Sequence, residues 1–353
     1  MYENFKELIS LAESYKNKIV IFFIANIKNK TKNYSDYSNT SVEAEFFSEE
    51  NYNKIINELA NRGFSVKCFF DEEDFISDCV SKQYYRELRK KIVVINSAQK
   101  GTYIGRKSLI PSFCDLCGFW YAGSNPYVCS LARDKFKTSC ILENLGIPCA
   151  KSYLYSYEYG WLNGKKPLND MIVIAKLNYE ASSIGLTENN CFVYSHEKDS
   201  FINELSTQYK QPVIVQEFID GYEIEFPFIK VDSILNTIPV NISFDESGKM
   251  GKDFLTYNLR KIRQYSFGNF RLIDSKTSKN ICDCSHTVIR ALDIKGLCRV
   301  DFRIKNNKKY YITDIATNPG YTKITSVNFA FSSMGFDYGE FLSIFIGAII
   351  KKY

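Results

Sequence analysis

Residues 298–326, CRVDFRIKNNKKYYITDIATNPGYTKITS, constrain the fold more than any other stretch of the chain. Two apolar segments, 300–304 and 310–315, flank a polar turn, and this pattern predicts a β-hairpin. Each predicted strand carries one carboxylate among apolar neighbours, Asp301 and Asp314. Paired strands bring these acids together, and two carboxylates facing a core repel each other unless a cation or a shared proton lies between them. The hairpin therefore predicts a metal site or a shared proton.

A turn follows the second predicted strand. Asn318, Pro319 and Gly320 leave backbone N–H groups free to face an anion. A hard divalent cation beside an anion-binding turn is the arrangement that phosphoryl transfer requires. The stretch therefore indicates phosphate chemistry.

The composition is that of an ordinary globular protein of two or three domains, with 353 residues, 45% hydrophobic and 24% charged. A net charge of +5 without a basic stripe gives no indication of a nucleic-acid partner. Residues 1–18 lack a signal-peptide core, and the longest apolar runs, 19–25 and 344–350, are too short to span a membrane. We therefore expect a cytoplasmic protein with neither a membrane nor a nucleic-acid partner.

Histidine and cysteine usage narrows the chemistry. The two histidines, His196 and His286, lie in no recognisable setting, so histidine metal sites and Ser-His or Cys-His nucleophiles are not expected. Eleven cysteines at irregular spacing indicate reduced thiols in the interior rather than a disulfide framework or a zinc site. The chemistry must rest on lysine, arginine, acidic and backbone groups.

Hydrophobic periodicity predicts how the chain is organised. The first part alternates helix and strand, which predicts an open, doubly wound α/β domain to about residue 125: helix 1–15, strand 18–25, helix 46–62, strands 65–70 and 91–95. Further along we expect helices at 130–145, 197–209, 278–292 and from 338, and strands at 152–155, 171–176 and 213–218. The long polar stretch 243–269 predicts a mobile active-site loop.

Two strand ends carry groups suited to a nucleotide. Lys176 ends an apolar strand and is followed by the small-residue loop 180–186, whose N–H and hydroxyl donors suit a triphosphate; the alternative is a lysine-capped strand with a Ser/Gly turn. The strand before Gly221 can offer backbone edges to adenine, and Glu223 can offer a carboxylate to ribose hydroxyls. Without other signals, this stretch is only the end of a strand. The phosphate loop G-x-x-x-x-G-K-[ST] and a G-x-G-x-x-G after a strand are absent.

Taken in order, these stretches resemble the ATP-grasp superfamily and, within it, the D-alanine–D-alanine ligase family. The resemblance runs over nearly the whole chain: 121–124, 130–135, 146–148, 180–186, 215–223, 299–301 and 314–322. It implies an α/β protein of three domains, with an N-terminal doubly wound parallel sheet (1–125), a central ATP-grasp subdomain (126–216) with the small-residue loop 180–186, which we call the serine loop, and a C-terminal ATP-grasp domain with the metal site and the mobile loop (217–353).

The resemblance also implies site residues. The ATP-binding set is Lys135, Lys176, Glu180, Ser182, Ser183, Ile184, Gly185, Gln216, Glu217, Phe218, Ile219 and Glu223, with Gln216 where the family usually has an acid. Arg299, the Gly320 amide and Ser182 are the implied catalytic groups, the first two holding the oxyanion of the acyl phosphate and of the tetrahedral intermediate. Asp301, Asp314 and Asn318 are the implied ligands of Mg²⁺, or of Mn²⁺ in its place. Ala316 stands where the family has a ligating asparagine.

The substrate segments depart from the family. Glu45 resembles the acid that binds the ammonium of the first amino acid, but Arg106 and Lys107 replace an acidic pair. These cations favour a substrate with an extra carboxylate or phosphate, unless they are solvated loop residues. Arg260, Thr325 and Ser326 occupy the other substrate-binding positions, without matching the family cleanly.

The sequence thus predicts an ATP- and Mg²⁺-dependent ligase that joins a small-molecule carboxylate and an amine through an acyl phosphate. Two alternatives remain: D-alanine–D-alanine ligase proper, and a nucleotide-binding protein with weak or lost turnover, which Ala316 motivates. The family suggests a homodimer.

Overall fold

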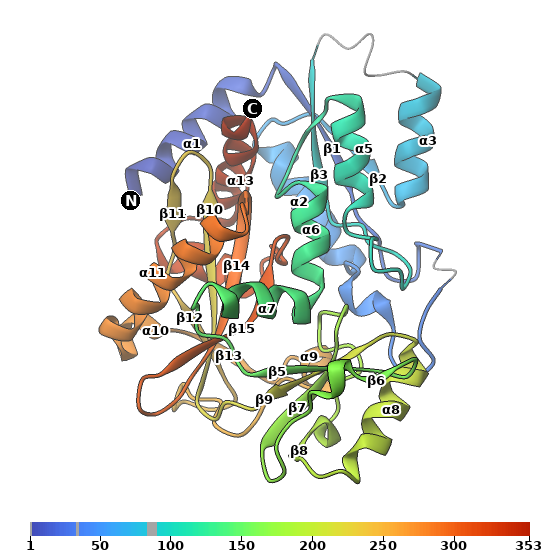
Figure 1. Cartoon of the computed structure of the whole chain (residues 1–353). Helices are drawn as coiled ribbons and strands as arrows, with labels where there is room; N and C mark the ends of the chain where they lie inside the picture. Colours follow the sequence, from blue (N-terminus) through green and yellow to red (C-terminus); the bar gives the residue numbers. More distant parts are fainter. Residues whose placement is uncertain (1, 33–34, 83–89) are drawn as a thin grey trace.

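The computed structural model describes residues 2–32, 35–82 and 90–353; Met1, predicted to begin the first helix, lies outside them. Three sheets form the framework (Figure 1). The first is parallel, in the order β2-β1-β3-β4, and consists of β1 (Ile19–Ile24), β2 (Val66–Phe69), β3 (Lys91–Asn96) and β4 (Trp120–Tyr121). The predicted doubly wound parallel sheet is therefore confirmed.

Side chains of β1 alternate between two hydrophobic cores, because successive residues of a strand point to opposite faces. Ile21 and Phe23 pack on one face with α1 (Tyr2–Tyr15), α2 (Glu49–Asn61) and α13 (Tyr338–Lys352). Phe22 and Ile24 pack on the other with α3 (Glu72–Lys82) and α5 (Leu109–Cys117). Helices on both faces explain why β1 is apolar throughout.

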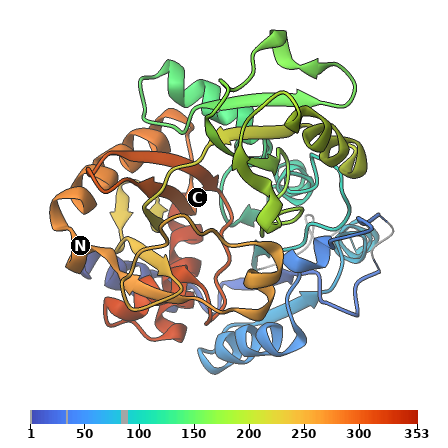
Figure 2. The same ribbon diagram turned by 90° about the horizontal axis from the view of Figure 1, so that it is seen from below.

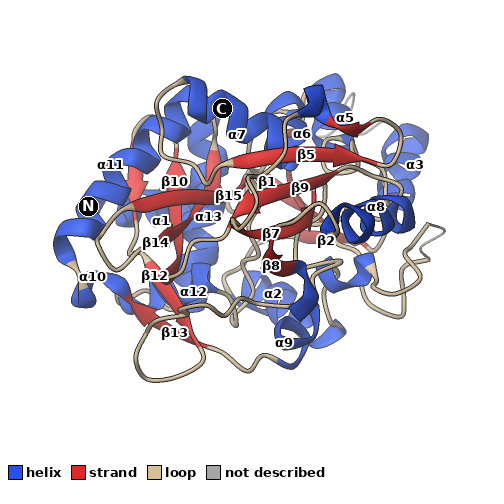
Figure 3. Ribbon diagram, turned by 60° about the horizontal axis from the view of Figure 1, so that its bottom comes forward, coloured by secondary structure: helices blue, strands red, loops and turns tan. Residues whose placement is uncertain are grey.

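The second sheet is antiparallel and has the order β6-β5-β9-β7-β8 (Figure 3). Its strands are β5 (Ser152–Ser156), β6 (Gly160–Trp161), β7 (Ile172–Leu177), β8 (Cys191–Val193) and β9 (Val213–Glu217). Helix α8 (Lys198–Tyr209) buries Ile202 and Leu205 against β7 and β9. The short helices η2 (Leu162–Gly164) and η3 (Glu188–Asn190) lie in its connections. This sheet presents the ends of β7 and β9, which carry Lys176 and Glu217.

The third sheet has the order β13-β12-β10-β14-β15, with β11 paired to β10. Its strands are β10 (Tyr222–Lys230), β11 (Ile234–Asn236), β12 (Val240–Ser243), β13 (Ser266–Asn269), β14 (Gly296–Ile304) and β15 (Tyr310–Ala316), and α10 (Phe270–Ile273) and α11 (Ser275–Ala291) follow β13. Helix α11 packs on this sheet, with Ile281 and Val288 in the same core as Val300 and Phe302. The predicted hairpin is confirmed, since β14 and β15 pair with Asp301 opposite Asp314.

Two expected elements are wrong in detail. The helix predicted at 130–145 is two helices, α6 (Pro126–Arg133) and α7 (Lys135–Asn144), which break at Asp134 (φ −85°, ψ 91°). The Asp134 carboxylate accepts hydrogen bonds from the Lys137 N–H (3.0 Å) and from Asn178 Nδ2 (2.9 Å), so it caps α7 and fixes it beside the end of β7. The stretch 243–269 is not a structureless loop, because it contains α9 (Tyr257–Ile262) and β13.

The last helix returns to the first sheet. Helices α1 and α13 lie side by side (Figure 1), and a Cβ at Gly347 of α13 would lie 2.0 Å from the carbonyl oxygen of Leu8. The two helices therefore approach through bare backbone. Within the described ranges no single helix is long and apolar enough to cross a membrane. Helices α12 (Ser326–Ser333) and α13 together have the length and composition of a membrane span, but the pair is bent by 104°.

We predict that Gly347→Ala lowers the free energy of unfolding by about 1–3 kcal/mol, because the added methyl forces α1 away from α13. The urea midpoint measures the change. Ser343→Ala, in the same helix, is the matched control. The Ser343 hydroxyl is buried and has no hydrogen-bond partner among the described residues, so its removal should leave stability unchanged or raise it. Equal midpoints for Gly347→Ala and the unsubstituted protein would contradict the prediction.

Candidate active site

A cavity of about 890 Å³ is lined by residues of the second and third sheets and by segments that follow β1 and β3 of the first sheet. Every residue that the sequence assigned to the site lines this cavity except Arg106 and Gly185. Residues hundreds of positions apart, such as Glu45, Lys176 and Asp314, thus share one space.

The hairpin acids form the floor of the cavity. Asp301 and Asp314 are paired in register, and Arg299 binds Asp301 with two bonds, Nε to Oδ1 (2.7 Å) and Nη2 to Oδ2 (2.8 Å). Arg299 Nη1 also binds Glu225 Oε2 at 2.8 Å. Burial raises the pKa of Asp301 to about 7, with Glu225 and Asp314 adding to the increase and Arg299 opposing it. Three carboxylates therefore crowd one guanidinium.

Glu225 was missed from the sequence, although a signal was present. It lies two residues beyond Glu223 on β10, and alternation along a strand puts both on one face. In the sheet, Glu225 is directly opposite Asp301. The hydroxyl of Ser326, assigned to substrate, donates a short hydrogen bond to Glu225 Oε2.

The residues fit a hard cation only in part. The crowding of carboxylates that raises the pKa of Asp301 is relieved by positive charge. However, Ala316 offers no ligand, Asn318 Nδ2 donates to the carbonyl of Asn96 (2.9 Å), and within the described residues no group of three or more His, Cys, Asp or Glu side chains is arranged to hold a metal. The chain therefore supplies fewer ligands than a closed metal site has. This shortage suits Mg²⁺, because that ion retains water and binds phosphate oxygens.

Charged residues line the predicted nucleotide end. Lys176 Nζ lies 3.3 Å from Gln216 Oε1 on the neighbouring strand, and burial lowers the pKa of this lysine. Lys135, at the first turn of α7, donates to the carbonyl of Glu180 and lies 3.7 Å from Asp314. The break at Asp134 thus turns a helix terminus, with its lysine, toward the hairpin acids.

The acids at this end already have cationic partners. Glu217 pairs with Lys305 at 3.1 Å, and Glu223 pairs with Arg303. Sequence reasoning found neither partner, because both cations lie on or just after β14, far from β9 and β10 in the sequence.

The serine loop is fastened over the cavity. Ser182 (φ 54°) and Ser183 (φ 57°) are adjacent left-handed residues, a costly conformation for side chains other than glycine that accumulates at functional sites. Ser183 Oγ donates to the carbonyl of Leu255 (2.7 Å). Gly185 packs beneath the loop instead of lining the cavity, since a Cβ there would lie 2.8 Å from Leu177.

The segment that carries α9 closes the cavity from the other side. The Tyr257 N–H donates to the carbonyl of Leu186 (3.0 Å), and the Ser41 N–H donates to the Tyr257 hydroxyl (3.2 Å). Figure 2 shows the golden segment with α9 beside the blue N-terminal residues and the green serine loop. The segments that follow β1, β7 and β12 therefore meet in one lid.

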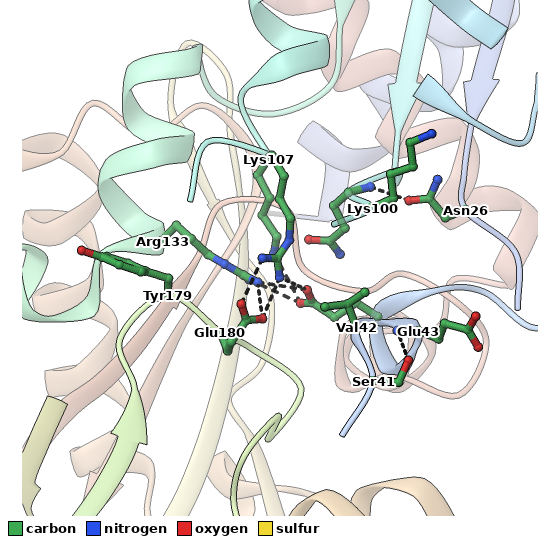
Figure 4. Close-up of polar contacts among 12 residues, drawn as sticks. Asn26, Ser41, Val42, Glu43, Lys100, Lys107, Arg133, Tyr179 and Glu180 are labelled. Carbon is green, nitrogen blue, oxygen red and sulfur yellow. Dashed lines mark hydrogen bonds and ion pairs between the residues drawn. The ribbon is translucent and has the colours of Figure 1, made fainter. Parts of the chain in front are cut away.

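Beside the lid lies a buried ion cluster, which consists of Glu45, Arg106, Arg133 and Glu180. Arg106 binds both Glu180 oxygens (3.0 and 2.7 Å) and Glu45 (3.2 Å), and Arg133 binds Glu45 (3.0 Å) and Glu180 (3.2 Å). Figure 4 shows Arg133 and Glu180 turned toward one another. Each of the four side chains is no more than 5% exposed. Tyr37 also donates to Glu180 (2.8 Å).

This cluster corrects two expectations. Arg106 neither faces the cavity nor is solvated, because Glu45 and Glu180 bind it in the interior. Glu45 is already paired with cations: burial alone would raise its pKa, but Arg133, Lys107 and Arg106 hold it well below the ordinary value. The sequence identified the acid but could not reveal that neighbouring cations occupy it.

Comparison with known proteins agrees with this architecture. The family model described as "D-ala D-ala ligase C-terminus" matches residues 143–347. The chain belongs to the D-alanine–D-alanine ligase family. The D-alanine–D-alanine ligase of Acetivibrio thermocellus is 27% identical over 289 residues, which cover 78% of this chain and 72% of that protein. The enzyme of the same name from Natranaerobius thermophilus is 29% identical over 253 residues, which cover 69% and 66%.

Solved structures of the family share the ATP-grasp α/β fold. The D-alanine–D-alanine ligase of Bacillus anthracis complexed with ATP superposes with a TM-score of 0.66 at 17% identity, covering 94% of this chain and 97% of that one. The VanG D-Ala:D-Ser ligase of Enterococcus faecalis gives 0.66 at 18% identity, covering 94% and 99%.

We predict that Arg106→Met lowers the free energy of unfolding by about 3–5 kcal/mol, because two buried carboxylates lose a shared partner. Arg62→Met is the control: Arg62 pairs with the exposed Asp337, and its loss should cost less than about 1 kcal/mol. Urea unfolding of both variants checks the difference. Similar values for the two would show that the cluster does not stabilise the fold.

The cluster also predicts a pH dependence. Glu45 keeps its charge in the folded state below its ordinary pKa of 4.5, so the stability that it contributes is present above pH 4.5 and is lost as the pH falls further. Urea midpoints of the protein and of Glu45→Gln should therefore differ most above pH 5 and converge toward pH 3. A constant difference across this range would contradict the assignment.

Proposed function

We propose that the chain is an ATP-dependent ligase that phosphorylates a small-molecule carboxylate and joins it to an amine. Family membership supports ATP-dependent, ADP-forming amide synthesis as the reaction class. The observation that carries the proposal is the crowded pair Asp301 and Asp314, which lies in one cavity with Lys135 and Lys176 under the serine loop. Crowded carboxylates beside two largely buried lysines suit a metal–nucleotide complex, in which the metal binds the acids and the phosphates bind the lysines.

The residues divide the work as follows. Lys135 and Lys176 neutralise phosphates, the serine loop covers them, and Gln216 to Ile219 border the adenine. Asp301 and Asp314, with Asn318, would hold Mg²⁺ or Mn²⁺, which neutralises charge on the transferred phosphoryl group. Arg299 and the Gly320 N–H stabilise the oxyanion that forms when the amine attacks the acyl phosphate. The closed lid keeps water from that intermediate. Dependence on ATP supports a cytoplasmic location, and the family suggests a homodimer.

The relatives favour one specific alternative, D-alanine–D-alanine ligase proper, because their names state that activity. A nucleotide-binding protein without turnover is favoured by Ala316, which faces Arg299 across the hairpin and offers no ligand.

The test is ADP release by the purified protein with ATP, Mg²⁺ and a panel of amino acids and small acids. We expect release that requires both an acid and an amine. Asp314→Asn should reduce it by about 100-fold or more, because a negative group that balances the cation is lost. Asp232→Asn, at an exposed acid, should have no effect.

The outcomes separate the three functions. Turnover with D-alanine alone establishes D-alanine–D-alanine ligase, and a requirement for a second, different substrate rejects it. Tight ATP binding without ADP release for any substrate, unchanged in Ala316→Asn, favours the protein without turnover.

A further inference from the structure

The buried ion-paired groups around Glu45 carry more positive than negative charge. Glu45 and Glu180 are the two carboxylates there, and Arg106, Arg133 and Lys107 are the three cations within ion-pair distance of them. The Nε atoms of both arginines are buried and have no acceptor among the described residues. This part of the protein therefore lacks acceptors rather than donors.

Glu45 has no room for a further cation. Its Oε2 accepts from Arg106 (3.2 Å) and Arg133 (3.0 Å), and its Oε1 lies 3.4 Å from Arg133 and 3.7 Å from Lys107. A substrate ammonium placed here would enter among three like charges, which is unfavourable at short range in a buried site.

Lys107 is the cation of this group that faces the cavity. It lines the cavity, whereas Arg106 and Arg133 do not, and its single carboxylate neighbour is at 3.7 Å, beyond hydrogen-bond distance. A lysine has three N–H donors, so the Lys107 ammonium is left to bind a ligand. Burial lowers its pKa to about 8, together with Arg133, Arg106 and Lys135 and against the effect of Glu45. An anion beside it would stabilise its charged form.

Further cations line the same cavity. Lys28, Lys261 and Arg263 line it, and the described part of the chain provides none of the three with a carboxylate within 4.0 Å. Burial, Arg263 and Lys261 lower the pKa of Lys28, and Glu43 opposes them. Such a wall raises the local concentration of anions.

We propose that the substrate at this end of the cavity carries a second anionic group, most simply a second carboxylate, that binds Lys107, and that it is not held through an ammonium at Glu45. The inference rests on the proposed function and specifies its substrate class as dicarboxylic or similarly dianionic acids. It departs from the sequence expectation for Glu45, and it assigns the selectivity to Lys107 alone instead of to Arg106 and Lys107 together.

Binding measured by calorimetry tests the proposal without requiring turnover. The protein, with Mg²⁺ and a non-hydrolysable ATP analogue, is titrated with succinate and with both enantiomers of aspartate, glutamate and alanine; 3-phosphoglycerate distinguishes a phosphate from a carboxylate. We expect at least one dianionic acid to bind about 10-fold more tightly than either alanine. Equal or tighter binding of alanine overturns the proposal.

Variants assign the effect to Lys107. Lys107→Met should weaken binding of the preferred dianion about 10-fold and leave binding of the ATP analogue unchanged, whereas Lys107→Arg should retain it. Lys54→Met is the matched control, because Lys54 lines the same cavity but pairs with Glu50 at the surface. A preference for dianions that survives in Lys107→Met overturns the assignment.

The pH dependence gives a readout that a purely structural role would not change. Glu45, Arg106, Arg133 and Lys135 are the charged groups that act on Lys107. Affinity for the dianion should fall as the pH rises above about 8 in the unsubstituted protein and stay level in Lys107→Arg. Failure of ADP release with intact, Lys107-dependent dianion binding would reject the ligase reaction and keep the site, so the two proposals fail separately.

Discussion

The fold is arranged around a shortage of positive charge on one hairpin. Asp301, Asp314 and Glu225 come from three neighbouring strands, and Arg299 alone binds two of them. In a buried setting this imbalance is costly unless a cation or a proton offsets it, and the raised pKa of Asp301 expresses that cost. The position of Lys135 at a helix break, facing Asp314, answers the same imbalance. A site of this kind is incomplete without a charged ligand.

The opposite imbalance occurs at the other end of the cavity. There the buried ion cluster joins α6, the serine loop and the two N-terminal segments that carry Glu45 and Arg106, and Lys107 beside it adds a third cation to its two carboxylates. Buried pairs of this type stabilise little relative to apolar contacts, but breaking them is expensive. The cluster therefore holds the base of the serine loop in one position, while Ser183 and Tyr257 fasten its tip. The cavity thus has one end that attracts cations and another that attracts anions.

Local pattern was enough to predict most of the framework. Two apolar segments around a polar turn predicted the hairpin and the pairing of Asp301 with Asp314, and apolar strands alternating with helices predicted the buried parallel sheet. Pattern did not predict the break at Asp134, where the local cap on Lys137 is joined by a bond from Asn178 of another element. The environment of Arg106 was also missed, since both of its carboxylate partners are distant in sequence. Residue identity indicates which groups carry charge, but only the tertiary fold determines which of those charges are already neutralised.

The return of α13 to the first sheet affects how the polypeptide is made. The core around Ile21 and Phe23 contains Phe341 and Phe345, and both other sheets intervene in the sequence between β1 and this helix. During synthesis on a ribosome, β1 would emerge long before the helix that covers it, so one apolar face of the nascent sheet stays open while the central portion is translated. Contacts between residues so far apart in the sequence slow folding, and until they form the exposed apolar surface is prone to aggregation. The core of the first sheet is thus completed only when the last helix has been made, and a polypeptide that ends before α13 would leave this core uncovered.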